Sequence, residues 1–338
     1  MRAYLLRRLF LLAFVFIALS IFAFSLAYLF PGNILNNISG LRQISPEQAG
    51  QLTSYYQLDK GYITQYIAYL QRIFSGDWGL SFSSQQPLLQ EIKTLTPATL
   101  ELAAYALFIS FFIGIPFGII AAIKPEGLLS KSISGLAITA YSLPIFWWGL
   151  LLIMIFSLGL GWLPTAGRIN VLYEIPHQTG FMLWDIYIAD TPYKRDAFYN
   201  ALQHLLLPTV VLATFPTTVM LRFTRDSMLD VWQQNYIKTA RAKGLSRGQV
   251  LYRHGLRNAL LPVIRQIGLQ FSTLLTLAMI TEIIFSWPGL GHWLIDSIYQ
   301  RNYPAIQAGL LMISTIVISA NMSTELLHTY FNPLARKQ

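Results

Sequence analysis

The sequence predicts an all-α membrane protein with six transmembrane helices. Hydrophobic residues make up 54% of the 338 residues and charged residues only 12%, against roughly 25% charged in a soluble domain. The apolar residues also gather in long runs, and about 20 of them in a row suffice to cross a bilayer as a helix. The net charge of +9 lies in the segments between these runs, a distribution that argues against nucleic-acid binding.

The first apolar run covers residues 9–30 and contains 22 residues without a charge, about 33 Å of helix. A cleaved signal peptide is the alternative, but the run exceeds the roughly 7–15 residues of a signal-peptide core. Phe30-Pro31 also does not resemble a small-residue cleavage site. Residues 1–30 are therefore expected to form a cytoplasmic N-terminus and a retained first transmembrane helix.

Residues 31–97 are polar by comparison, with four basic and four acidic residues and several turn signals. This length is too great for a tight turn, so we expect a small extracytoplasmic subdomain after the first helix. Within it, Ser45 as N-cap and Pro46 at the next position predict a helix over residues 45–56.

Residues 98–330 are expected to form a core of five further transmembrane helices, followed by a cytoplasmic tail at 331–338. Proline or glycine interrupts several of the apolar runs, as at Pro144, Pro208 and Pro216. Such residues are tolerated in a membrane helix when neighbouring groups satisfy the freed backbone atoms, so they predict a packed bundle. The five runs cover residues 98–122, 132–160, 201–221, 262–285 and 304–330.

The distribution of Lys and Arg predicts the orientation. With the N-terminus inside, the inner segments hold 16 Lys/Arg in 68 residues and the outer segments hold 8 in 127. Because cytoplasmic loops are enriched in basic residues, both termini are predicted to be cytoplasmic. The same orientation places the loop at residues 222–265 in the cytoplasm.

This loop, residues 222–265, is the most basic segment of the chain, with nine Lys/Arg and two acidic residues. Within it, helical spacing puts small and apolar groups on one side of a short helix that Gly244 ends. Basic residues fill the other side. A solvated loop that merely obeys the charge rule is the alternative, but small residues also allow another backbone to approach. The small and apolar side contains Tyr236, Ile237, Ala240 and Gly244.

The stretch from Asn235 to Pro262 resembles the "EAA" loop of binding-protein-dependent ABC-transporter permeases, in the oligopeptide/dipeptide branch. In that family the short helix of the loop is the coupling helix, which docks in a cleft of the ATPase subunit. Lys238 stands where the motif has Glu, and 17 residues separate Gly244 from Pro262, more than in the general motif. The peptide branch shares both departures. The resemblance assigns ATPase coupling to Asn235, Tyr236, Thr239, Ala240, Ala242, Gly244 and Pro262.

Further stretches resemble the same family and occur in its order along most of the chain. Two passages, residues 171–200 and the run that ends at Gly291, resemble permeases of Sap-type systems, which are associated with antimicrobial peptides and in some members with putrescine. The other matching stretches are SGDWGLSFSSQQP (75–87), PATLEL (97–102), SLPIFWWGLLL (142–152), GWLPTAGR (161–168), HLLLPTVVL (204–212) and TEIIFSWPGLG (281–291).

The resemblance implies a type I ABC importer permease (MetI-like) fold in the bacterial inner membrane. Its implied partners are a second homologous permease, two ATPase subunits, a periplasmic substrate-binding protein and the lipid bilayer. ATP and Mg would be bound by the ATPase subunits, because this chain has no phosphate-binding GxxxxGK[ST] loop. Peptides are the expected cargo, and putrescine export is the alternative.

The sequence offers no enzyme signature. The five His have no metal-ligand spacing, and no hydrolase motif occurs, so we expect neither a metal site nor catalysis. Glu101 and Glu282 lie within apolar runs, where an ionisable group often lines a pathway; a structural role near a membrane surface is the alternative for both. An ion-coupled secondary transporter would use these two carboxylates, but it should also show inverted repeats, and the sequence has no convincing internal symmetry.

Overall fold

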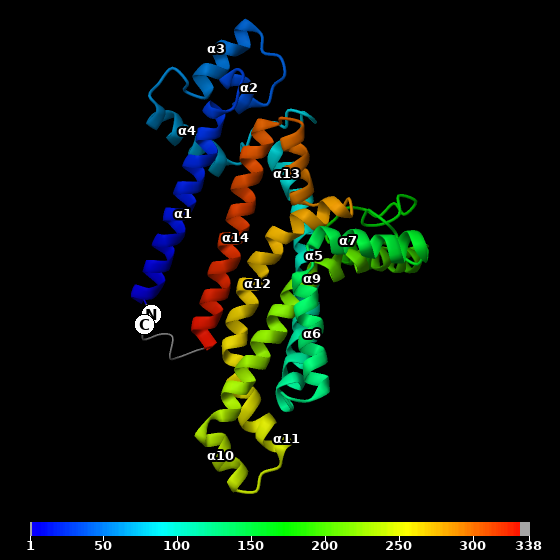
Figure 1. The fold of residues 1–338 in the computed structure, drawn as a ribbon. Helices are drawn as coiled ribbons and strands as arrows, with labels where there is room; N and C mark the ends of the chain where they lie inside the picture. Colours follow the sequence, from blue (N-terminus) through cyan, green and yellow to red (C-terminus); the bar gives the residue numbers. More distant parts are fainter. Residues whose placement is uncertain (1, 332–338) are drawn as a thin grey trace. The chain divides into compact units, whose positions relative to one another are not determined.

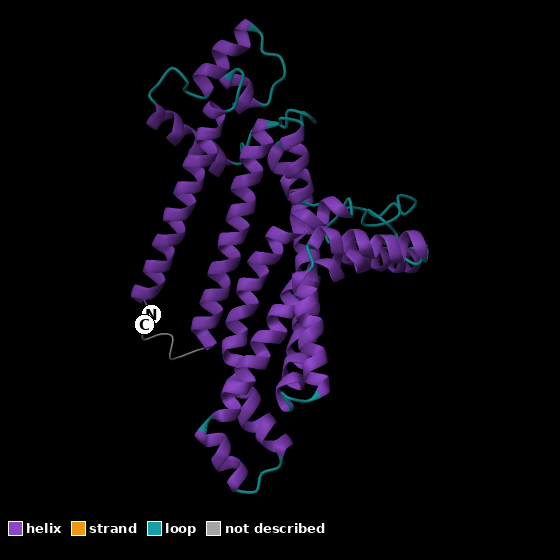
Figure 2. Ribbon diagram, in the orientation of Figure 1, coloured by secondary structure: helices purple, strands orange, loops and turns teal. Residues whose placement is uncertain are grey.

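The computed structural model describes residues 2–331 and consists of helices joined by loops, as Figure 2 shows. Among these residues the only β-type pairing outside helices is an isolated bridge between Leu80 and Pro87. The prediction of an all-α fold is therefore confirmed. The predicted tail at 331–338 lies outside the described residues, apart from Phe331.

Four helices are long and apolar enough to cross a membrane, and two bent helix pairs raise the number of candidate spans to six. This agrees with the six predicted spans. The continuous spans lie in α1 (Arg2–Leu29), α5 (Leu88–Ile123), α9 (Lys194–Gln233) and α14 (Tyr303–Phe331). The bent pairs are Leu128–Ser142 with Ile145–Gly159 and Gly248–Val263 with Gly268–Ile284.

The third predicted span, residues 132–160, is not one continuous helix. The chain turns by 103° between α6 (Leu128–Ser142) and α7 (Ile145–Leu152), which continues as η1 (Ile153–Gly159). Leu143 has an extended backbone because the ring of Pro144 disfavours a helical conformation in the residue before it. By contrast, Pro208 and Pro216 both lie inside the continuous helix α9.

The helices form two compact units. The first unit contains the chain up to Thr99, His177–Phe181 and Pro288–Ser319, and the second contains Leu100–Pro176, Met182–Trp287 and the chain from Ala320. The predicted subdomain at 31–97 thus groups with residues late in the chain. A cluster that includes Leu88, Ile92, Leu290, Ala305 and Ala308 is the hydrophobic core that joins them.

In the first unit, α1 is followed by three short helices and the turn that leads to α5 (Figure 1). The predicted helix start at Ser45 is confirmed: its hydroxyl accepts a hydrogen bond from the Gln48 N–H at 3.3 Å, and the Gln48 side chain accepts one from the Ser45 N–H. Later in this unit, α13 (Leu290–Tyr299) precedes α14. The short helices are α2 (Ile34–Ser39), α3 (Pro46–Tyr55) and α4 (Tyr62–Ser75).

In the second unit, α9 packs along α12 (Leu256–Ile284). A Cβ on Gly118 of α5 would lie 2.6 Å from the Leu221 carbonyl oxygen of α9, so these two backbones can approach only because the residue is glycine. Three short helices connect the C-terminal end of α9 to the N-terminal end of α12 (Figure 1). They are α10 (Asn235–Ala242), α11 (Arg247–Val250) and η2 (Leu251–Gly255). A short helix, α8 (Met182–Ile188), packs against the start of α9.

Candidate functional site

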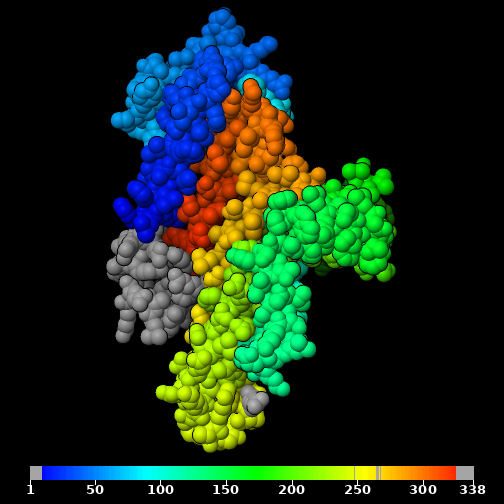
Figure 3. All heavy atoms as spheres, in the orientation of Figure 1, coloured from blue at the N-terminus to red at the C-terminus, as the bar shows by residue number. Residues whose placement is uncertain are grey.

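The predicted coupling segment folds as a short helix set at an angle to the long helix before it. A single extended residue, Gln234, separates the end of α9 from the start of α10. Helix α10 covers Asn235–Ala242, which confirms the predicted short helix before Gly244, and with α11 it forms a lobe at the end of α9 (Figure 3).

Ile237 and Ala240 fix α10 to its neighbours. Both side chains are buried, and with Val250 of α11 they form a small hydrophobic cluster. Trp232 of α9 and Leu245 pack against this cluster. The apolar side of α10 therefore joins α9 to α11 within the chain, and α10 is held against other elements along its length.

Gly244 ends the helix, and this prediction is confirmed. Its φ of +81° is left-handed, a conformation that glycine adopts without strain. The Gly244 N–H donates to the Arg241 carbonyl at 3.0 Å and the Leu245 N–H donates to the Ala240 carbonyl at 3.4 Å. These two bonds and the contact of Leu245 with the cluster around Ala240 are the Schellman arrangement. The turn is thus fixed by backbone geometry.

A second local signal starts the next helix, and the sequence analysis missed it. The Ser246 hydroxyl accepts a hydrogen bond from the Gln249 N–H at 3.4 Å, and the Gln249 side chain accepts one from the Ser246 N–H at 3.0 Å. This Ser-x-x-Gln capping box precedes α11 and could have been recognised in the sequence. It makes the turn between α10 and α11 rigid at both ends.

Only part of the small and apolar side of α10 is exposed. Ile237 and Ala240 on that side are buried, because they pack against Val250. Ala240, which the resemblance assigns to ATPase coupling, thus packs within the chain. The residues of the segment that stay exposed are Asn235, Tyr236, Lys238, Thr239, Arg241, Ala242, Lys243 and Gly244.

Pro262 lies on a different helix. It is exposed inside α12, six residues after the helix start at Leu256. The structure therefore groups the remaining predicted residues on and just after α10 and places Pro262 on a separate helix.

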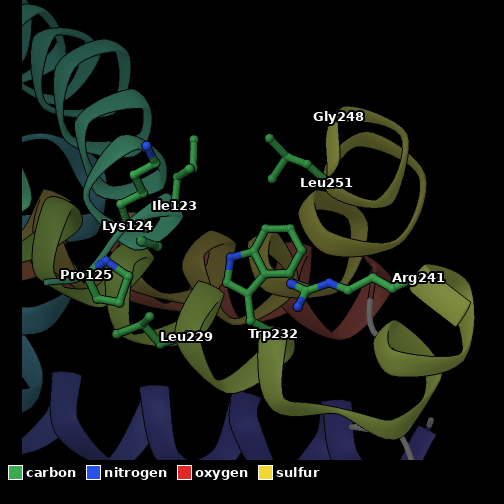
Figure 4. Close-up of a pocket in the computed structure, with 9 residues that line it drawn as sticks. Ile123, Lys124, Pro125, Leu229, Trp232, Arg241, Gly248 and Leu251 are labelled. Carbon is green, nitrogen blue, oxygen red and sulfur yellow. The ribbon is translucent and has the colours of Figure 1, made fainter. Parts of the chain in front are cut away.

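An open cavity of about 630 Å³ adjoins the segment. Its walls come from the end of α5, the end of α9, Arg241 of α10, and the start of the return towards α12 (Figure 4). The Arg241 guanidinium lies 4.9 Å from the centre of the Trp232 ring, a cation–π contact worth about 0.5–1 kcal/mol at an exposed site. The lining residues are Ala122, Ile123, Lys124, Pro125, Leu229, Trp232, Arg241, Gly248 and Leu251.

The chemistry of this cavity is apolar with a basic rim. Among the described lining residues, Lys124 and Arg241 are charged, and both are cationic. The indole Nε1 of Trp232 is buried and has no hydrogen-bond acceptor among the described residues. The cavity and the exposed face of α10 together suit a protein surface that supplies acidic or hydrogen-bond-accepting groups.

Glu101, one of the two predicted pathway residues, is paired within the chain. Its side chain is 3% exposed and forms an ion pair with Arg168, whose Nε lies 3.1 Å from Glu101 Oε2. Glu101 also accepts hydrogen bonds from the backbone N–H groups of Met182 and Leu183 at the start of α8. These partners compensate the buried charge.

The pair joins three stretches that are distant in sequence. Arg168 lies 5.6 Å from the centre of the Trp287 ring, and the neighbouring Gly167 N–H donates to the Phe285 carbonyl at 2.8 Å. The stretches PATLEL, GWLPTAGR and TEIIFSWPGLG therefore meet here. The sequence analysis did not assign Arg168 a partner, although an Arg close to the end of an apolar run is a signal for such a pair.

Glu282, the second predicted pathway residue, is fully buried in α12. Its carbonyl accepts a hydrogen bond from the Trp287 N–H at 2.8 Å, which helps to turn the chain after the helix. Neither Glu101 nor Glu282 lines the cavity beside α10. Within residues 2–331, no group of three or more His, Cys, Asp or Glu could hold a metal ion.

Two family models together match nearly the whole length of the chain. Residues 114–337 match the family described as "Binding-protein-dependent transport system inner membrane component". Residues 1–103 match the family described as "Binding-prot-dependent transport system membrane comp, N-term".

Curated relatives are similar over nearly their full length. The chain is 42% identical to the di/tripeptide transport system permease protein DppB of Pseudomonas aeruginosa, with all of both chains covered. It is 40% identical to the peptide transport system permease protein SapB of Salmonella typhimurium, covering 98% of this chain and 97% of that one. Escherichia coli K12 SapB, named a putrescine export system permease protein, is 39% identical over the same shares.

A solved structure shares the fold. The MetNI methionine ABC transporter, in an inward-facing conformation, aligns with a TM-score of 0.55 over 73% of this chain and 99% of the matched chain. Sequence identity in that alignment is 15%, so the similarity concerns the fold alone.

Proposed function

The chain belongs to the family of binding-protein-dependent transport system inner membrane components, and from this premise we propose how it works as a peptide permease. It is the membrane subunit of an ABC transporter, and its relatives at about 40% identity are named as di/tripeptide, dipeptide and peptide permeases. We propose short peptides as the cargo. The chain itself acts as a transport subunit, and ATP with Mg is bound and hydrolysed by separate ATPase subunits.

The exposed face of α10 is the proposed docking surface for an ATPase subunit. The observation that carries this proposal is a helix held firmly on its apolar side while its basic and small residues face outward. A rigid helix transmits a displacement of its partner to α9 and α12, which it joins. The partner shifts the permease between conformations only by the difference in its contacts in the two states.

The remaining partners and the orientation extend this proposal. A second homologous permease completes the translocation pathway, a second ATPase subunit docks on it, and a periplasmic binding protein delivers the cargo. The excess of Lys and Arg in segments 1–8, 123–131, 222–265 and 332–338 supports cytoplasmic termini and a cytoplasmic α10. The ion pair between Glu101 and Arg168 favours a structural role for Glu101 over an ion-coupling role, which weakens the secondary-transporter alternative.

Substitution of Ala242 with Glu tests the docking surface. Ala242 is exposed on α10 and Glu is a good helix former, so Ala242→Glu adds bulk and negative charge without disturbing the helix. It is a sharper probe than Gly244→Glu, because any side chain at the positive φ of Gly244 strains the turn. We expect Ala242→Glu to remove co-purification of the ATPase subunits and ATP-driven peptide uptake in proteoliposomes.

The matched control is Gln51→Glu, which adds the same charge at an exposed position on α3. It should leave both co-purification and uptake unchanged. Wild-type uptake by Ala242→Glu would contradict the docking role. Parallel assays with labelled dipeptide and labelled putrescine distinguish the two cargoes, since Escherichia coli K12 SapB is named for putrescine export.

A further inference from the structure

Helix α4 lies against α1 through a series of side-chain contacts. The Tyr62 and Tyr28 rings are 5.5 Å apart, and Phe24 lies 5.6 Å from Tyr66 and 5.5 Å from Tyr69. Within the same unit, the chain that leaves α1 thus folds back onto it (Figure 1).

Two deeper contacts continue this series along α1. The hydroxyl oxygens of Ser20 and Tyr66 are 2.7 Å apart, and the rings of Phe16 and Phe74 are 6.2 Å apart. As residue numbers rise along α4 they fall along α1, so α4 runs back along the helix that precedes it. From Tyr28 to Phe16 the contacts cover 12 residues of α1, about 18 Å of helix.

The contacted part of α1 belongs to a membrane span. Phe10–Leu29 is apolar enough to cross a bilayer, whose hydrocarbon core is about 30 Å thick. Phe16 is 13 residues from the end of this span at Leu29, about 20 Å along the helix axis. A side chain that touches Phe16 is therefore at the depth of the hydrocarbon, and Phe74 of α4 is such a side chain.

The free side of α4 is apolar. Ile63, Ile67 and Phe74 are 78%, 50% and 75% exposed, and their spacing of four and seven residues puts them on one face. Leu70 falls on the same face and is partly exposed. We call these four residues the α4 stripe.

The one charged side chain of α4 and one of its amides face away from the stripe. Arg72 is the only charged residue of the helix, and its guanidinium lies 4.2 Å from the centre of the Tyr56 ring. Gln65 is buried and donates to the Lys60 carbonyl at 2.6 Å. Thr64 and Gln71 are exposed beside the stripe. A helix in water would expose its arginine and cover Ile63 and Ile67, whereas α4 does the reverse.

We propose that α4 is embedded in the bilayer beside α1 and that its stripe contacts the acyl chains. Part of the segment expected to form an extracytoplasmic subdomain is then in the membrane. The occupant of the stripe is lipid, because the stripe continues the apolar surface of a membrane span and carries no charge. The proposal requires only that α1 crosses the bilayer; that α4 enters the bilayer from the outer side rests on the orientation proposed above.

Site-directed spin labelling tests this proposal, since the chain has no native cysteine. Single variants Ile63→Cys, Ile67→Cys and Phe74→Cys are labelled in the full-length chain, assembled with its partner subunits in nanodiscs. Collision rates with oxygen, which partitions into lipid, and with a water-soluble nickel chelate are measured by EPR. The control is Glu47→Cys, at an exposed position on α3. A variant that does not elute as a single species is replaced by Leu70→Cys.

We expect nickel collision rates several-fold lower at the stripe than at position 47, with high oxygen collision rates. The ratio of oxygen to nickel collisions should rise from position 63 through 67 to 74, because α4 descends along α1. Nickel access equal to that at position 47 would overturn the proposal by placing the stripe in water. Exclusion of both reagents at all stripe positions would also overturn it, because a protein partner would then cover the stripe.

Discussion

Helices α4 and α10 are both short and amphipathic, and each packs against a long helix. The difference is that α10 buries its apolar face, whereas α4 exposes it. Helix α10 buries Ile237 and Ala240 and exposes its cations. Helix α4 covers Arg72 with Tyr56 and exposes Ile63 and Phe74. The direction of the apolar face thus indicates the surroundings of each helix: α10 suits water and a protein partner, and α4 suits lipid.

The largest expected effect on stability comes from replacing an isoleucine with alanine, and it should differ between the two helices. Ile237→Ala should cost about 2–5 kcal/mol, because it leaves a cavity in a fully buried cluster. Ile67→Ala should cost much less, because that side chain is half exposed. Hydrogen exchange of the α10 and α4 amides measures both effects. Equal protection of α10 in wild type and Ile237→Ala would show that the cluster does not hold the helix.

A new carboxylate should destabilise the protein far more on the exposed face of α4 than on that of α10. Ile67→Asp should destabilise the protein in bicelles by on the order of 1–3 kcal/mol, because a charge in the hydrocarbon is costly and the cost falls towards the interface. Lys238→Asp, on the exposed side of α10, should change the free energy of unfolding by less than about 0.5 kcal/mol. Similar values for both variants would remove the distinction between the two faces.

The smallest effect concerns the end of α10. Gly244→Ala should cost about 1–2 kcal/mol, because the left-handed conformation at φ +81° strains a residue with a Cβ. Gly244→Asn should cost less, since Asn tolerates this conformation better. No atom of the described side chains and backbone lies within 4 Å of the added Cβ, so a clash with them does not contribute. Equal stability of the two variants, measured by unfolding in the same bicelles, would show that backbone strain does not decide the turn.

Features encoded by neighbouring residues were predictable from the sequence. The helix start at Ser45, the short helix α10 and its end at Gly244 each depend on a few adjacent residues, and all three predictions are confirmed. The number of candidate spans also follows from local composition. These features need no knowledge of what packs against them.

Features set by distant residues were not predictable in this way. Nothing near Glu101 in the sequence indicates that Arg168 neutralises it 67 residues later. Composition predicted an extracytoplasmic subdomain over residues 31–97, but it could not show that α4 packs along α1 through Phe74 and Phe16. Proline content likewise did not show that the chain bends sharply at Pro144 and stays helical through Pro208.

Cross-linking from the exposed face of α10 tests the docking role most directly. A photoreactive amino acid at Thr239, which is exposed on α10, is introduced into the assembled, ATP-hydrolysing transporter, and the same group at Gln51 on α3 is the control. We predict a cross-link from position 239 to an ATPase subunit, with a yield that changes when ATP is added, and none from position 51. An active transporter that gives no cross-link to the ATPase from position 239 or 242 would contradict the docking role of α10.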